Sequence, residues 1–290
     1  MQSGTSRMSL NGHRKAESPQ EETVKHGETL IVGLGEVGSA LAEVLERKSP
    51  VLRHDIEPRE FDAPIGVMHI CIPFQESAQF EKIVCSYIKR FDPALTIINS
   101  TILPGTTTAI AARTGKPVAY SPVRGKHVRM TQDMLRYVKY VAASDPQAAG
   151  TAQSHFEAAG MKTRRMERPE TLELAKLAET TYFGVLIAFA QDLDRYARRI
   201  GADYDEAINF FEEVDFLPRT RYFPGVIGGH CVLPNIQILR KIADSPLLEA
   251  VLESNSIRAR ELEPERAENR RRKPARRDTH KRDGDMLSNR

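Results

Sequence analysis

Thr29-Leu30-Ile31-Val32-Gly33-Leu34-Gly35-Glu36-Val37-Gly38 is the stretch of sequence that decides the fold. A run of β-forming residues ends in three glycines with the spacing Gly-x-Gly-x-x-Gly, and apolar residues at helical spacing follow over 39–47. In this context the first glycine permits a tight turn, the second lets the backbone approach a pyrophosphate, and the third lets the helix pack on the strand. The stretch therefore predicts a dinucleotide-binding loop made of residues 33–38. A methyltransferase loop and a purely structural glycine turn are the alternatives.

An acidic residue follows the next predicted strand. Residues 51–54 form a short β-rich run, and Asp55 comes directly after it, about 20 residues beyond the glycines. A carboxylate at this position accepts hydrogen bonds from ribose hydroxyls and repels a 2′-phosphate. Asp55 thus favours NAD over NADP, although Arg53 and Arg59 lie near enough in sequence to oppose that preference. The alternative for Asp55 is a solvated loop residue.

Strands and helices alternate along the first half of the chain. Further strands are predicted at 67–72, 95–99, 118–120 and 137–142, and helices at 77–91 and from the Leu103-Pro-Gly105 turn to about 113. This alternation predicts βαβ units in an α/β fold with a Rossmann-type, doubly wound parallel sheet.

The pattern changes near residue 168. Residues 169–200 contain one glycine inside otherwise helical spacing, which predicts a single helix about 45 Å long. A second helix is predicted at 204–213, a loop at 214–235, and further helices at 236–242 and 247–260. We expect disordered polar tails at 1–27 and 263–290, an NAD-binding domain at 28–166, and a helical domain for substrate binding and dimerisation at 167–262.

Composition and charge exclude several classes of protein. Of the 290 residues, 40% are hydrophobic and 28% are charged, so the chain is not disordered throughout. No apolar run approaches the ~20 residues that span a bilayer, and the first 28 residues contain no apolar signal segment. The net charge of +3 is concentrated at the end, where residues 263–290 hold ten Lys or Arg and six Asp or Glu. We therefore expect no membrane and no nucleic-acid partner, and we interpret the basic tail as a solvated charge run.

The three cysteines, Cys71, Cys85 and Cys231, are too far apart for a disulfide framework or a zinc cluster, so we expect no metal and a cytoplasmic location. Cys231 differs from the other two because it follows Gly228-Gly229-His230, where the glycines let the backbone present a thiol at a surface. A thiolate there can attack an aldehyde carbon, and hydride loss then gives a thioester. The alternative is a small buried apolar residue.

Other candidate site residues lie on the long helix and at the ends of strands. Lys176 and Thr180 share one face of the helix, where a lysine and a hydroxyl can stabilise an oxyanion. Ser100 and Thr101 follow a strand at the carboxyl edge of the sheet, as hydroxyls that order a water or the nicotinamide, or as helix caps. The loop after 118–120 offers a small cationic cluster for a phosphate or carboxylate, or a plain surface loop; its members are Arg124, Lys126 and His127.

Together these residues resemble the UDP-glucose/GDP-mannose dehydrogenase family over about 27–250. The resemblance is carried by five motifs in the family's order: Gly33-Leu-Gly35-Glu-Val-Gly38, Cys71-Ile72-Pro73, Asn99-Ser-Thr101-Ile-Leu-Pro-Gly-Thr-Thr, Glu173-Leu-Ala-Lys176 and Gly228-Gly-His-Cys231. It implies that NAD contacts the first three motifs. It also implies that a sugar CH–OH group is oxidised, with Cys231 as thioester-forming nucleophile, Lys176 as oxyanion-stabilising lysine and Thr101 ordering the catalytic water. The long helix would make a homodimer.

The chain departs from the family pattern at several positions. Thr180 stands where the family has Asn, Asn235 where it has Asp, and Val123 where it has Glu. The family's third domain, which binds the nucleotide half of the substrate, would begin near the end of this chain. These departures leave the identity of the substrate open, and we expect a sugar nucleotide or another anionic sugar that is bound by Arg124 and Lys126.

Two other functions remain open. One is a two-electron β-hydroxyacid-type dehydrogenase, in which Lys176 is the acid/base and Cys231 is incidental. The other is a catalytically inactive, NAD-binding paralogue that acts as a partner subunit.

Overall fold

A computed structural model describes residues 27–264 of the chain, apart from 58, 213, 216–221 and 230. The expected polar tails, 1–27 and 263–290, lie almost entirely outside the described residues.

The described residues contain one seven-stranded sheet with the order β2-β1-β3-β4-β5-β6-β7. Its strands are β1 (Glu28–Val32), β2 (Val51–His54), β3 (Ile65–Ile70), β4 (Leu95–Ile98), β5 (Val118–Tyr120), β6 (Lys139–Ala143) and β7 (Thr163–Arg165). All pairings are parallel except β5 with β6, which is antiparallel. The predicted Rossmann-type α/β fold is confirmed, with this one antiparallel pairing as a correction to the expected all-parallel sheet.

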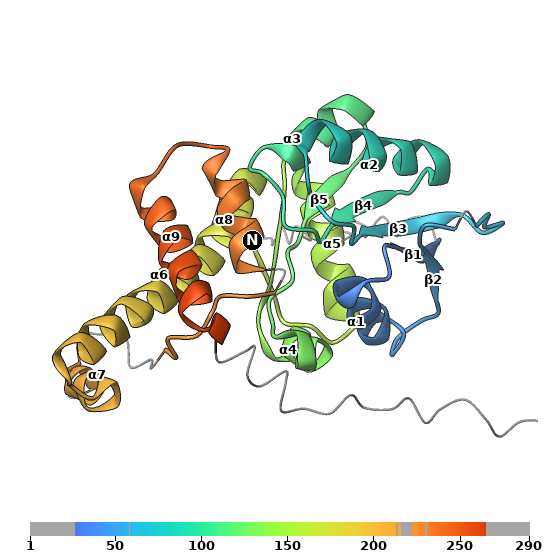
Figure 1. Cartoon of the computed structure of the whole chain (residues 1–290). Coiled ribbons are helices and arrows are strands. Elements are labelled where there is room, and N and C mark those ends of the chain that lie inside the picture. The colour runs from blue at the N-terminus through green and yellow to red at the C-terminus, as the bar shows by residue number, and fades with distance from the viewer. Residues whose placement is uncertain (1–26, 58, 213, 216–221, 230, 265–290) are drawn as a thin grey trace, which may run out of the picture.

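Helices cover both faces of the sheet, as Figure 1 shows. The helices of the sheet domain are α1 (Glu36–Leu45), α2 (Ser77–Phe91), α3 (Thr106–Thr114), α4 (Met130–Arg136) and α5 (Pro146–Ala158), and a short 3-10 turn spans His127–Arg129. Alternate residues of β1 enter opposite layers: Ile31 packs with α1, α4 and α5, and Leu30 and Val32 pack with α2 and α3. This period of two is what a sheet buried on both faces requires.

The helical part is built on α6 (Pro169–Ile200), which leaves the sheet and continues away from it (Figure 1). It is followed by α7 (Tyr204–Glu212), α8 (Val232–Arg240) and α9 (Pro246–Glu261). A third apolar cluster joins α6, α8 and α9, with Ile236 and Val251 at its centre. Gly184 lets α8 approach α6, because a Cβ there would lie 2.8 Å from a Val232 methyl group. The α8 helix begins within the predicted loop 214–235; Pro234 lies in its first turn, where a missing N–H costs no helical hydrogen bond.

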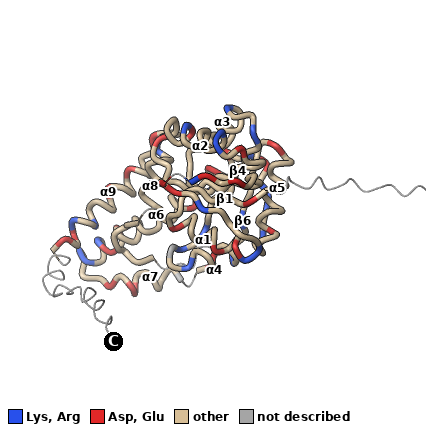
Figure 2. Tube along the Cα trace, turned by 90° about the vertical axis from the view of Figure 1, so that its right-hand side faces the viewer, with Lys and Arg blue, Asp and Glu red and all other residues tan. Residues whose placement is uncertain are grey.

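Figure 2 shows Lys/Arg and Asp/Glu interspersed over both parts of the molecule. Among the described helices, none is long and apolar enough to cross a membrane.

Candidate active site

The glycine loop between β1 and α1 has the geometry of a phosphate cradle. Gly33 adopts a φ of +91°, and its N–H donates to the carbonyl of His54 at 2.9 Å. A Cβ on Gly38 would lie 1.8 Å from the Gly33 carbonyl oxygen, so only glycine lets α1 pack on this turn. A Cβ on Gly35, in contrast, would meet nothing within 4 Å. The second glycine thus faces open space at the start of α1, as a loop that receives a pyrophosphate requires.

Asp55 directly follows β2 and is exposed. The guanidinium of Arg53 is paired with Glu46 at 2.8 Å. Arg59 is exposed two residues before Phe61, and its carbonyl accepts a hydrogen bond from Arg90 at 2.9 Å. Of the two arginines that the sequence placed near Asp55, one is therefore already engaged.

The carboxyl ends of β3 and β4 bring the next predicted residues together. Ile72 contacts the glycine loop, since its methyl group lies 3.0 Å from a Cβ built on Gly33, and Pro73 is exposed beside it. The hydroxyl of Ser100 donates to the Ile72 carbonyl at 2.6 Å, which ties the two loops together. The half-buried Thr101 hydroxyl has no hydrogen-bond partner among the described residues. Thr101, rather than Ser100, is thus the hydroxyl that is free to bind a ligand or water.

Lys176 reaches from α6 to the loop after β5. Its ammonium donates to the carbonyl of Val123 at 2.9 Å, and burial lowers the pKa of this lysine below its usual value. Glu173, one turn before it, is fully buried and accepts hydrogen bonds from the N–H groups of Gly105 and Thr107 at the start of α3. The Glu-Leu-Ala-Lys motif thus combines a helix cap with a lysine at the sheet edge.

Thr180 and Asn235 pair with each other. The buried Asn235 side chain donates to the Thr180 hydroxyl at 3.0 Å, and that hydroxyl donates back to carbonyls of α6. Thr180 thus joins α6 to α8, one turn after Lys176. Asn235 also donates its backbone N–H to the carbonyl of Cys231, so this pair fixes the first turn after the cysteine.

Cys231 is exposed at the N-cap of α8, where its thiol is within the electrostatic influence of Lys176 on α6 and Glu36 on α1. Burial of the sulfur raises the pKa of its thiol, the Lys176 ammonium lowers it, and the Glu36 carboxylate raises it. His230, its neighbour in the sequence motif, lies outside the described residues. The glycine loop, Lys176 and Cys231 are far apart in the sequence, but the fold brings them to one region of the molecule.

The cationic loop after β5 is engaged within the protein. Arg124 donates twice to one oxygen of Glu179, at 2.8 and 3.0 Å. Lys126 is exposed and its backbone N–H donates to Asp133, whereas the side chain of His127 lies outside the described residues. Arg124 is therefore the member of this cluster that the structure places close to Lys176, and the two line one cavity of about 290 Å³.

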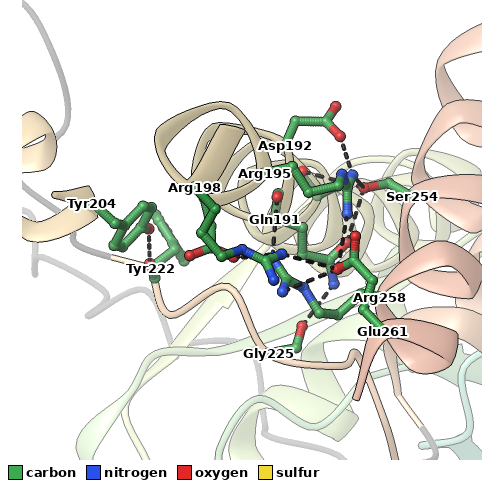
Figure 3. Close-up of polar contacts among 12 residues, drawn as sticks. Gln191, Asp192, Arg195, Arg198, Tyr204, Tyr222, Gly225, Ser254, Arg258 and Glu261 are labelled. Atoms are coloured by element: carbon green, nitrogen blue, oxygen red, sulfur yellow. Dashed lines mark hydrogen bonds and ion pairs between the residues drawn. The ribbon is translucent and has the colours of Figure 1, made fainter. Parts of the chain in front are cut away.

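A polar network between α6 and α9 holds the loop that leads to Cys231. Gln191, which is fully buried, donates to the carbonyl of Gly225 at 2.6 Å, and the Tyr204 hydroxyl donates to the carbonyl of Tyr222 at 2.6 Å (Figure 3). On the other side, Ser254 donates to Gln191 at 3.0 Å and Arg258 forms an ion pair with Asp194 at 2.5 Å. The loop preceding the thiol is thus anchored to α6 by Gln191 and to α7 by Tyr204, and α9 supports α6.

Sequence reasoning missed a buried polar cluster under this site. The ammonium of Lys139 donates to the carbonyls of Ser121 and Pro122 at 2.8 and 3.0 Å, and burial lowers its pKa to about 7. Next to it, the ring of the fully buried His69 contacts Asn99 at 3.1 Å and His155 at 2.9 Å. Lys139 and Lys176 together bind three consecutive carbonyls of the loop after β5. In the sequence, the one sign of this cluster was Lys139, a charged residue within the predicted strand 137–142.

No group of His, Cys, Asp and Glu within the described residues could hold a metal ion.

Comparison with known proteins gives consistent matches. The model of the UDP-glucose/GDP-mannose dehydrogenase family, central domain, matches residues 170–257, which run from α6 to α9. The UDP-N-acetyl-D-mannosamine dehydrogenase of Methanocaldococcus jannaschii is 30% identical over 166 residues, or 56% of this chain and 39% of that protein. The chain therefore spans about two fifths of the length of this curated relative.

Solved structures share the fold. UDP-D-ManNAc dehydrogenase from Pyrococcus horikoshii superposes with a TM-score of 0.71 at 21% identity, over 84% of this chain and 72% of that one. The 3-hydroxyisobutyrate dehydrogenase of Mycobacterium tuberculosis superposes with a TM-score of 0.62 at 14% identity, over 81% of this chain and 94% of that one.

Proposed function

We propose that this chain, a member of the UDP-glucose/GDP-mannose dehydrogenase family, is an NAD-dependent dehydrogenase that oxidises a CH–OH group of a sugar nucleotide or another anionic sugar. The observation that carries the proposal is that Lys176 bonds to the loop after β5, while Asn235, one turn after Cys231, bonds to Thr180, one turn after Lys176; these two contacts bring the cysteine and the lysine to the carboxyl edge of the sheet. This edge is where ligands bind in open α/β sheets.

The residues fit a dinucleotide. The open space over Gly35 and the start of α1 would take the pyrophosphate, and Asp55 would accept hydrogen bonds from a ribose without a 2′-phosphate. Residues Leu34, Glu36, Val37, Ile72, Pro73 and Ser100 would line the rest of the cofactor site. When bound, the cofactor supplies a hydride acceptor. We assign residues 28–166 to cofactor binding and 167–262 to the substrate and to assembly.

Lys176 would stabilise the developing alkoxide as the substrate CH–OH loses its hydride. Its ammonium is held by the Val123 carbonyl and is partly desolvated, so it meets negative charge in a low-dielectric setting. The Thr101 hydroxyl, without a partner among the described residues, would order a water at the same edge.

Cys231 would act in a second oxidation. Its thiolate would add to the aldehyde carbon, and the adduct would lose a hydride, for which a second molecule of NAD would be the acceptor, to give a thioester. Water would then release the carboxylic acid and the thiol. Thr180 and Asn235 would hold the first turn of α8 rather than exchange protons, because they are hydrogen-bonded to each other.

A second candidate is a two-electron dehydrogenase of the β-hydroxyacid type. The observation that favours it is the raised pKa of the Cys231 thiol, to which burial and the Glu36 carboxylate contribute. A thiol that stays protonated would take no part in the reaction, and Lys176 would act as the acid/base that accepts and returns the proton of the substrate hydroxyl.

The test is a screen of sugar nucleotides and phosphorylated sugars for NADH formation, with the number of NADH counted per substrate consumed. Two NADH support the thioester route, and one supports simple alcohol oxidation. No NADH with any compound of a broad panel, from a protein that binds NAD, would favour a non-catalytic role.

We also propose a homodimer through α6. Six large apolar side chains on this helix are exposed in the single chain, namely Leu174, Tyr182, Phe183, Phe189, Tyr196 and Ile200. A monomer in sedimentation at micromolar concentration would contradict this proposal.

A further inference from the structure

Three arginines and two tyrosines form one surface beside the candidate active site. The guanidinium of Arg124 lies 6.0 Å from the Tyr137 ring and 5.8 Å from the Tyr140 ring. Arg136 lies 5.6 Å from the Tyr137 ring, and Arg164 lies 5.9 Å from the Tyr140 ring. We refer to these five residues as the Arg–Tyr surface. Because an aromatic face attracts a guanidinium, the two rings restrict where the three cations point.

The topology places the Arg–Tyr surface at the edge of the sheet where ligands bind. Since β6 is antiparallel to β5, the amino end of β6 lies next to the carboxyl end of β5. Since β7 is parallel to β6, Arg164 near its amino end lies at the same edge. The surface therefore continues the row of strand ends that carries the glycine loop and Thr101, on the far side of the catalytic candidates.

A cavity connects the Arg–Tyr surface to the candidate catalytic lysine. The cavity of about 290 Å³ is lined by Arg124, Tyr140, Lys176 and Glu179, with Met166 and Leu172 as apolar walls. A substrate whose reacting carbon lies at Lys176 would thus extend along Tyr140 towards the arginines.

The charge of this surface suits an anion. The Arg124 charge is balanced by Glu179, with 2.8 Å between guanidinium and carboxylate. Arg136 and Arg164 are exposed, and neither has a carboxylate within ion-pair distance among the described residues. Guanidinium groups recognise phosphoryl oxygens through paired hydrogen bonds, and several arginines at one site suit a ligand with more than one phosphoryl group.

We infer that the Arg–Tyr surface binds the diphosphate of a nucleoside diphosphate carried by the substrate. The inference rests on the proposed function for the identity of the substrate, but the binding itself requires no turnover. It assigns the phosphate contacts to the sheet domain of this chain, through Arg136 and Arg164, beside the engaged Arg124.

The test measures binding of uridine 5′-diphosphate by titration calorimetry to the full chain that has been saturated with NAD. We expect binding that weakens as salt is raised, that pyrophosphate competes with, and that uridine does not reproduce. The double variant Arg136→Gln/Arg164→Gln should weaken it at least tenfold. Arg113→Gln, which removes an exposed arginine of α3 that is paired with Glu81 of α2, is the matched control and should change nothing.

Three results would overturn the inference: affinity that the double variant retains, uridine binding as tightly as its diphosphate, or no diphosphate binding at all. Displacement of the diphosphate by NAD would also overturn it, because the diphosphate would then occupy the glycine loop. NAD affinity and NADH formation are measured separately on the same preparations. If they persist while diphosphate binding fails, the inference is wrong and the proposed function stands.

Discussion

The side chain of Asn255 forms two hydrogen bonds with the backbone of Ile227. Its amide nitrogen donates to the Ile227 carbonyl at 3.1 Å, and its oxygen accepts from the Ile227 N–H at 2.7 Å. Asn255 lies on α9 and is buried, and Ile227 lies four residues before Cys231. A single side chain thus replaces the strand partner that an isolated, buried backbone segment would otherwise need.

Asn255→Ala should destabilise the protein by about 2–3 kcal/mol, because it leaves a buried N–H and a buried carbonyl without partners. Hydrogen exchange of the Ile227 amide should accelerate more than that of the sheet amides. Ser256→Ala, on the exposed side of the same helix, is the control. Equal exchange at Ile227 in variant and wild type would show that Asn255 does not hold this loop.

Substitutions at the second and third glycines of the glycine loop, Gly35 and Gly38, should separate the effect on stability from the effect on cofactor binding. Gly38→Ala places a Cβ 1.8 Å from the Gly33 carbonyl oxygen, so it should fail to fold or lose several kcal/mol of stability. Gly35→Ala meets open space at a φ of −68°, so the free protein should keep its melting temperature. The same methyl group would stand where a pyrophosphate must approach, and we expect NAD affinity to fall at least tenfold.

Thermal melting and NADH fluorescence titration measure the two effects. Unchanged NAD affinity in a well-folded Gly35→Ala protein would place the cofactor elsewhere.

Lys139 should make stability depend on pH. Its pKa is about 7 in the folded protein, because of burial, and near 10.4 in an unfolded chain. Between these values the unfolded chain binds the extra proton, so the free energy of unfolding should rise as pH increases from about 7 to about 10. Lys139→Met should flatten that rise while it lowers stability at pH 9, since two carbonyls lose their donor.

Urea denaturation at pH 7, 8 and 9 measures this dependence. Lys162→Met, at an exposed lysine in the turn before β7, is the control and should keep the wild-type slope. A wild-type free energy of unfolding that falls over this range would contradict the assignment to Lys139.

Much of the fold followed from periodicity. The ranges 51–54, 77–91, 118–120 and 169–200 agree with β2, α2, β5 and α6. The sequence did not reveal α5, whose buried face is mostly alanine and gives little contrast with its polar face, or β7, which has three largely polar residues. Local patterns of hydrophobicity cannot identify elements that bury so little apolar surface.

The site was predictable residue by residue but not as an arrangement. Spacing marked Lys176, Thr180, Cys231 and Asn235, yet it could not show that Thr180 pairs with Asn235 or that Lys176 binds the Val123 carbonyl. The buried cluster depends on the lateral order of strands β3, β4, β5 and β6, which carry or precede His69, Asn99, Ser121 and Lys139. Strand order is a tertiary property, so a lysine inside a strand pattern does not disclose its partners.

Two neighbours should shift the titration of Cys231 in opposite directions. The Lys176 cation lowers the pKa of the thiol and the Glu36 carboxylate raises it. Lys176→Met should therefore raise the pH at which Cys231 is half alkylated by iodoacetamide, and Glu36→Gln should lower it. Peptide-resolved mass spectrometry follows the three cysteines separately, with the half-buried Cys71, whose pKa is about 12, as an internal reference that stays slow. Shifts of the same sign in both variants would mean that the three groups do not meet in solution.

The two catalytic candidates are distinguished by turnover on a substrate found in the NADH screen. If Cys231 forms a thioester, Cys231→Ser should abolish acid formation and leave at most one NADH per substrate, because an alkoxide is much harder to generate than a thiolate. Lys176→Ala should slow both oxidations by about 10²–10³, the typical cost of one lost oxyanion donor. If the enzyme is instead a two-electron dehydrogenase, the relative effects of the two variants reverse: Lys176→Ala abolishes activity, and Cys231→Ser leaves it almost unchanged. Since Asn235 is bonded to Thr180 and offers no carboxylate to the thiol, we expect slow wild-type turnover in the second oxidation. A second step as fast as the first would show that another group activates Cys231, and the turnover of the Glu36→Gln variant would then show whether Glu36 is that group.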